Sequence, residues 1–162
     1  MEYKHNYNYQ KCVELLKYDA SLLKQNKLLR EENKLKYSEL KSYLLQINEH
    51  LHWSKKNAYS QLIEDFLNYK IDAKKFDNKF SKMVNTIEDE SRSLTKNYEM
   101  LKEIRPNSAS FEFAKWISEI YLCCNEFYED YYLMERDDPA IKSDEQLRSA
   151  VTTLYTEIQK YS

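Results

Sequence analysis

The apolar residues of this chain recur three and four positions apart over most of its length, which is the spacing of amphipathic α-helices. Two prolines, Pro106 and Pro139, and several polar stretches divide the pattern. It predicts an all-α fold, in which one long N-terminal helix precedes an antiparallel, up-and-down four-helix bundle. Asp72, Ser108 or Ser110, and Ser143 are the expected N-caps of the last three helices. The predicted helices cover residues 10–52, 58–69, 72–105, 108–134 and 143–161.

The first predicted helix carries leucines at intervals of seven residues, which is the repeat of a coiled coil. In that register Asn26 and Asn33 occupy positions where asparagine favours a two-stranded pairing. Leu16 and Leu44 widen the apolar stripe, and a wide stripe is more typical of a helix that lies on its own domain. We favour self-packing over a homodimer, with both left open. The dimer or packing stripe comprises Leu15, Leu22, Asn26, Leu29, Asn33 and Leu40.

A weakening of the pattern at residues 52–57 predicts a kink or short linker, so we expect two segments. Residues 1–57 would be a helical extension, and residues 58–162 the bundle. The first segment has 11 Lys/Arg against 7 Asp/Glu, whereas the second has 14 against 20. The front is therefore basic and the rear acidic, but acids interrupt the basic front too often for an arm that binds nucleic acid directly.

The absence of glycine from all 162 residues excludes several kinds of site. Phosphate-binding loops, dinucleotide fingerprints and nucleophile elbows need glycine where the backbone takes a positive φ or touches a ligand. Three cysteines are too few for a disulfide framework and suggest a reducing compartment. No apolar leader or membrane-spanning stretch is visible, so we expect a protein of the cytoplasm or, if organelle-encoded, the stroma, neither secreted nor membrane-inserted.

The sequence shows no catalytic constellation. Glu49 and His52 form the Glu-x-x-His step of di-iron bundles, but His5 is the only histidine outside this segment, so a second such step cannot be built. Cys123 and Cys124 lie among apolar residues, where a thiol is poorly reactive. We therefore expect no enzyme activity, no cofactor and no metal site.

An acidic and aromatic segment, residues 126–138, is the most unusual surface candidate, with six acids and four aromatic residues. Tyrosine beside acids suits a protein interface. Two simpler interpretations stay open: a solvated helix end, or pairing with the chain's own Lys-rich helix. The candidate partner-binding residues are Glu119, Glu126, Tyr128, Glu129, Asp130, Tyr131, Glu135, Asp137 and Asp138.

Two stretches resemble the colicin D immunity family. Residues 66–76 match its Phe-Leu-x-x-Lys-Ile-x-Ala-x-x-Phe pattern, and residues 119–127 are similar to its Glu-aliphatic-aromatic-x-small-small-x-x-Phe helix. The resemblance covers residues 60–161 and has no counterpart for the first 57. It implies a helical bundle that blocks a toxin's tRNA-cleaving domain with acidic groups. Of the candidate acids, only Glu119 occupies a matching position.

These observations give two hypotheses of function. The first is a non-catalytic, immunity-type module that binds a partner with a basic surface. The alternative is a structural or linker subunit of a larger assembly, encoded by an organelle such as a plastid. Abundant Lys, Asn and Tyr indicate that the gene belongs to an AT-rich genome, plasmid or organelle.

Overall fold

A computed structural model describes residues 6–132 and 143–161, with side chains omitted for 128–132. These residues form helices and no strand, so the all-α prediction is confirmed. Two of these elements are short 3₁₀ helices and carry the label η. The elements are α1 (Tyr9–Leu23), α2 (Leu29–Glu32), α3 (Lys34–Ser54), α4 (Lys56–Leu67), α5 (Ala73–Leu94), η1 (Tyr98–Glu103), α6 (Ser108–Tyr132), α7 (Asp144–Ile158) and η2 (Gln159–Tyr161).

The predicted single helix over residues 10–52 is wrong, because the chain reverses between α1 and α3. Asn26 takes a left-handed backbone conformation, with φ of 57°. The Lys27 N–H donates to the Leu22 carbonyl and the Asn26 N–H to the Leu23 carbonyl, each at 3.0 Å. This is the Schellman arrangement that ends helices, with asparagine in glycine's usual place. No continuous helix therefore remains to carry the coiled coil that was the less favoured of the two interpretations.

The stripe leucines instead fill a core within the chain. Leu15, Leu22, Leu29 and Leu40 pack with Ile87 of α5 and Leu101 of η1. Asn26 is exposed, and Asn33 is the N-cap of α3, where its Oδ1 accepts from the Lys36 N–H at 3.0 Å. The repeat of seven thus reflects burial against the chain's own helices, as the favoured of the two interpretations expected.

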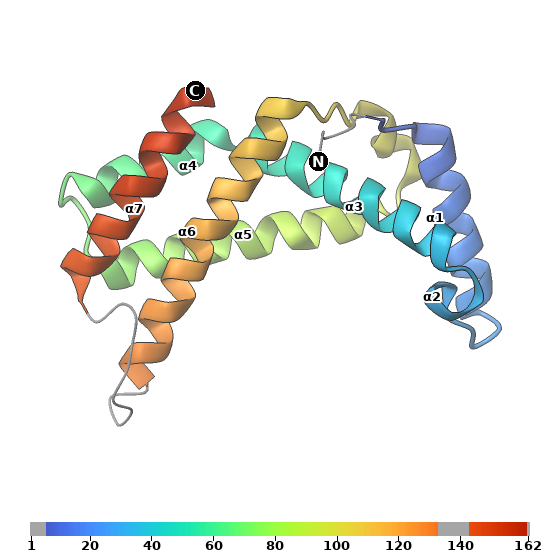
Figure 1. Cartoon of the computed structure of the whole chain (residues 1–162), viewed down its shortest axis with the longest axis horizontal. Coiled ribbons are helices and arrows are strands. Elements are labelled where there is room, and N and C mark those ends of the chain that lie inside the picture. The colour runs from blue at the N-terminus through green and yellow to red at the C-terminus, as the bar shows by residue number, and fades with distance from the viewer. Residues whose placement is uncertain (1–5, 133–142, 162) are drawn as a thin grey trace.

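A second, larger core lies among α4, α5, α6 and α7. Its fully buried aromatic members are Tyr59, Phe66, Phe76, Phe80 and Phe113. In Figure 1, α3 and α4 are consecutive, α5 returns beneath them, and α6 and α7 lie across this layer. The kink expected within residues 52–57 is confirmed, since Lys55 separates α3 from α4. Because α3 packs on both α5 and α6, packing continues across residue 57.

Local capping signals predicted helix starts well. Asp72 accepts from the Lys75 N–H at 2.7 Å and Ser143 from the Gln146 N–H at 3.2 Å, as predicted. At α6 the cap is Asn107, not Ser108 or Ser110: the Ser110 N–H donates to Asn107 Oδ1, and Ser110 Oγ accepts from the Asn107 N–H, both at 2.9 Å. These reciprocal bonds form a capping box. The third predicted helix ends early, at Leu94, and η1 continues toward Pro106.

Arg148 joins α7 to the turn between α4 and α5. Its guanidinium donates to the carbonyl of Phe66, and to that of Ile71 at 3.0 Å. The guanidinium carbon lies 4.1 Å from the Phe66 ring centroid and 4.2 Å from that of Tyr69. The side chain therefore satisfies two backbone acceptors while its charge rests against two aromatic faces.

His52 lies buried between α3 and α4, where its Nδ1 and the Tyr59 hydroxyl form a hydrogen bond of 2.9 Å. Burial disfavours the charged imidazole and lowers the pKa of His52 to about 4. The same burial raises the pKa of Tyr59. The pair is therefore neutral near pH 7, which suits a hydrogen bond inside an apolar core.

Replacing Arg148 with lysine should lower the free energy of unfolding by about 2 kcal/mol, because one ammonium cannot serve both carbonyls and stack on both rings. Urea denaturation measures the change. Arg92→Lys is the matched control, since Arg92 forms only exposed ion pairs and should change stability by less than about 0.5 kcal/mol. Equal losses in both variants would show that Arg148 is not a structural tie.

His52 should make stability pH-dependent. Its pKa is about 4 in the folded chain and near 6.5 when unfolded, so between these values the unfolded state binds more protons. This contribution, up to about 3 kcal/mol, is complete above pH 6.5 and is lost as the pH falls toward 4. Urea unfolding across this window should give a flatter profile for His52→Asn, although that variant is less stable at pH 7. Parallel profiles would contradict the assignment.

Candidate partner-binding surface

The predicted partner-binding residues belong to α6, from Glu119 onward, and to residues 133–138. Two of them, Glu119 and Glu126, are described, and both are exposed. The remaining seven lie outside the residues whose side chains the structure describes: Tyr128, Glu129, Asp130, Tyr131, Glu135, Asp137 and Asp138. The described part of α6 therefore defines the candidate surface.

The period of α6 separates a buried face from an exposed one. Phe113, Ile117, Ile120 and Cys124 are buried in the larger core. Positions 112, 115, 119, 122 and 126 recur at intervals of three and four, so they share the opposite face. Leu122 is 53% exposed and lies between Glu119 and Glu126 on that face. We call Glu119, Leu122 and Glu126 the α6 face.

The carboxylates of Glu119 and Glu126 act on one side chain between them. Cys123 is half-buried. Burial is the main cause that raises the pKa of its thiol, and the negative charges of Glu126 and Glu119 raise it further. Burial and then the charge of Asp77 raise the pKa of Cys124 as well. Both thiols are therefore protonated near pH 7, which makes them poor nucleophiles. The two glutamates thus produce one local negative field.

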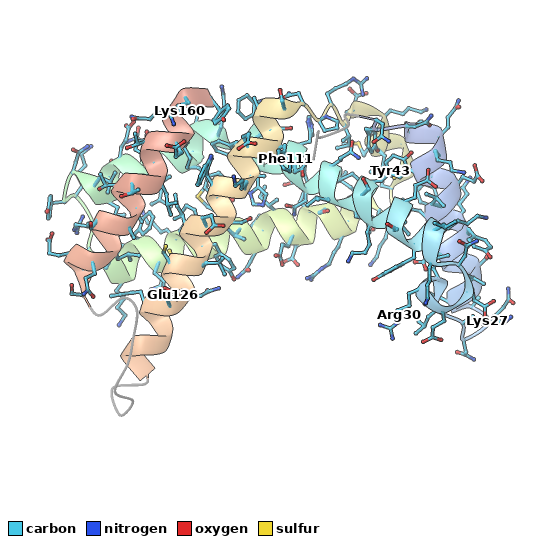
Figure 2. All side chains as sticks on the ribbon, in the orientation of Figure 1. Lys27, Arg30, Tyr43, Phe111, Glu126 and Lys160 are labelled. Atoms are coloured by element: carbon cyan, nitrogen blue, oxygen red, sulfur yellow. The ribbon has the colours of Figure 1, made fainter. Side chains whose placement is uncertain are left out.

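The Lys-rich front of the chain does not neutralise the α6 face. Among the described residues, neither Glu119 nor Glu126 takes part in an ion pair. Lys11 and Lys27 instead pair locally with acids of the front, and α1 contacts α3 and η1. In Figure 2, Lys27 lies at one end of the molecule, far from Glu126. Internal pairing, which the sequence left open, is not found for these two glutamates.

Both histidines of the segment from Glu49 to His52 have structural partners. His52 is the buried partner of Tyr59, and His50 Nδ1 accepts from the Arg105 N–H at 3.3 Å. Within the part of the chain that the structure describes, no three His, Cys, Asp or Glu side chains are grouped to hold a metal ion.

Sequence reasoning missed a groove between α4 and α5. Its volume is about 540 Å³, its walls are mostly apolar, and Lys55, Lys79 and Lys82 stand at its rim. Met83 of α5 is half-buried: it packs against the larger core and also lines the groove. One feature of the sequence could have indicated the groove. The spacing of Lys79, Lys82 and Met83 places two lysines beside an apolar residue on one face of the helix.

Sequence reasoning also missed an apolar tip at the α1–α3 end of the molecule. Leu23, Leu28 and Leu35 are 53%, 36% and 85% exposed there. The three leucines flank α2 in the sequence: Leu23 ends α1, Leu28 precedes α2 and Leu35 lies in the first turn of α3. In Figure 1 this end, near α2, is remote from α6.

None of the helices in residues 6–132 and 143–161 is both long enough and apolar enough to cross a bilayer. Comparisons of the chain with protein-family models, with curated proteins and with solved structures gave no match.

Proposed function

We propose that this chain is a non-catalytic protein-binding module whose α6 face binds a partner with a basic surface. The observation that carries the proposal is Leu122, more than half exposed between two glutamates that are in no described ion pair. Protein interfaces commonly have an apolar centre and a polar rim, and an exposed leucine flanked by two charged glutamates has this composition.

The charges on the α6 face would act on rate and orientation more than on affinity. A negative field attracts a basic surface over about one Debye length and speeds encounter. Burial of Leu122 would then add a favourable hydrophobic contribution once the two surfaces meet. The two glutamates would thus speed association, and Leu122 would stabilise the complex once it has formed.

The resemblance to colicin D immunity proteins supplies a specific form of this proposal. In that form α4 to α7 are the immunity-type bundle, and the partner is a toxin domain that cleaves tRNA. Carboxylates would occupy the places of RNA phosphates on such a domain, which must be basic to hold its substrate. Glu119 is the residue that the resemblance and the exposed α6 face have in common.

The alternative, a structural subunit of a larger assembly, is favoured by one observation. The apolar tip of Leu23, Leu28 and Leu35 lies far from the α6 face and would supply a second, independent contact. An inhibitor of one enzyme needs a single interface, whereas a linker needs two. Purification from the native source separates the two functions by the number of proteins that accompany the chain.

The double substitution Glu119→Lys with Glu126→Lys should weaken binding by at least about tenfold, because it reverses the field that faces the partner. Binding to the protein captured from the native source is measured between about 50 and 500 mM salt. The variant should also lose most of the salt dependence of the wild-type affinity.

Glu90→Lys with Glu103→Lys is the matched control, since both glutamates are exposed, lie on α5 and η1, and give the same change in net charge. It should leave the affinity within about twofold of wild type. If the α6 variant instead kept both the affinity and the salt dependence of wild type, the α6 face would not be the binding surface.

A further inference from the structure

We propose that the groove between α4 and α5 binds an amphipathic helix of another protein, with an apolar stripe and acidic flanks. This surface differs from the α6 face in residues and in charge. No described residue of α6 or α7 lines the groove. The two proposals can therefore fail separately.

The groove extends along both helices over several turns. On α4 its lining includes Ala58, Gln61, Leu62 and Asp65, which are spaced by three, one and three residues. Together with Lys55, the N-cap of α4, they span eleven residues, a rise of about 15 Å along the helix axis. The lining of α5 runs from Lys79 to Ile87. A trough between two neighbouring helices is the surface on which a third helix packs.

The floor of the groove can admit large side chains. Leu62, Met83 and Ile87 supply apolar surface, and the lining also includes the small residues Ala58 and Thr86. Ala58 is exposed although it is apolar, and Met83 is only half-buried. Leucine-sized side chains of a docked helix would cover this floor in the manner of peptides that bind helical grooves.

Charge specifies the flanks of the partner. Lys55, Lys79 and Lys82 are exposed, and the described ion pairs involve none of them. Asp65 is the one acid in the lining, and its Oδ1 already accepts from Lys70 Nζ and Gln61 Nε2, both at 3.0 Å. The lining therefore carries three lysines against one acid that is already paired. An acidic partner would meet a net positive rim.

The lysines are spread along the groove, which favours a helix over a single anionic headgroup. Ring contacts pair Tyr59 with Phe80 and Phe66 with Phe76, so α4 and α5 run antiparallel. In this register Lys55 lies near the Ile87 end, while Lys79 lies toward Asp65. Acids repeated on a helix can meet all three lysines, whereas one carboxylate cannot.

The test uses the full chain and a labelled peptide of about 18 residues, or five turns, with a leucine stripe flanked by glutamates. Fluorescence anisotropy should show saturable binding that weakens with salt. The same peptide with lysine in place of every glutamate should bind at least about tenfold more weakly. Equal affinity for the two peptides, or no binding of the acidic one at about 1 mM, would overturn the proposal.

Variants of the chain locate the binding. Lys79→Glu with Lys82→Glu should weaken binding of the acidic peptide by at least about tenfold, and Ala58→Trp should abolish it by filling the floor. Lys24→Glu with Lys96→Glu, the matched control away from the groove, should bind as wild type does. Equal losses in the groove variant and this control would overturn the proposal, as would a normal affinity in Ala58→Trp.

Two further measurements identify other occupants. Light scattering on the chain alone would reveal a dimer that Lys79→Glu with Lys82→Glu dissociates, and such a dimer would assign the groove to a second copy. Saturable dodecanoate binding that Ala58→Trp abolishes, without binding of the acidic peptide, would assign it to an anionic amphiphile. Either result would overturn the proposal of a partner helix.

Discussion

The arrangement of α4, α5 and α7 depends on the guanidinium of Arg148. It is held between the rings of Phe66 and Tyr69, and it donates to the carbonyls of Phe66 and Ile71. Two neighbouring contacts extend this tie: Tyr69 donates to Glu145 at 3.3 Å, and the Ala73 N–H donates to Asp144 at 3.2 Å. The first turn of α7 thereby fixes the α4–α5 turn, and with it the orientation of both groove walls.

A chain without glycine must make that turn from another residue. Tyr69 takes φ of 60°, and its neighbour Lys70 donates its N–H to the Asp65 carbonyl at 2.9 Å. A left-handed tyrosine costs about 1 kcal/mol or more, which the ring offsets by covering Arg148. Because the chain has no glycine, this turn is made by a residue whose ring packs on Arg148.

Helix starts could be predicted from the sequence because a cap is a local interaction. Asp72 and Ser143 bond the backbone three residues on, whatever the rest of the fold does. The reversal at Asn26 could not be predicted, because asparagine is tolerated within a helix as well as at its end. The conformation at Asn26 is decided by burial, because the reversal allows the leucines of α1 and α3 to enter one core with Ile87. That gain is visible only when α5 is in place.

The two candidate surfaces also differ in whether they could be predicted from the sequence. The exposure of Glu119 and Glu126 results from the period of one helix, so sequence reasoning could find them. The groove, in contrast, forms because α4 and α5 lie side by side and no other described helix covers this side of them. The apolar periodicity of a single helix cannot indicate how two helices are placed relative to each other. Tyr59 connects the two surfaces, since it lines the groove and its ring centroid lies 6.1 Å from that of Phe113 on α6. Because both rings are fully buried in a packed core, the α6 face and the groove are held at a fixed separation.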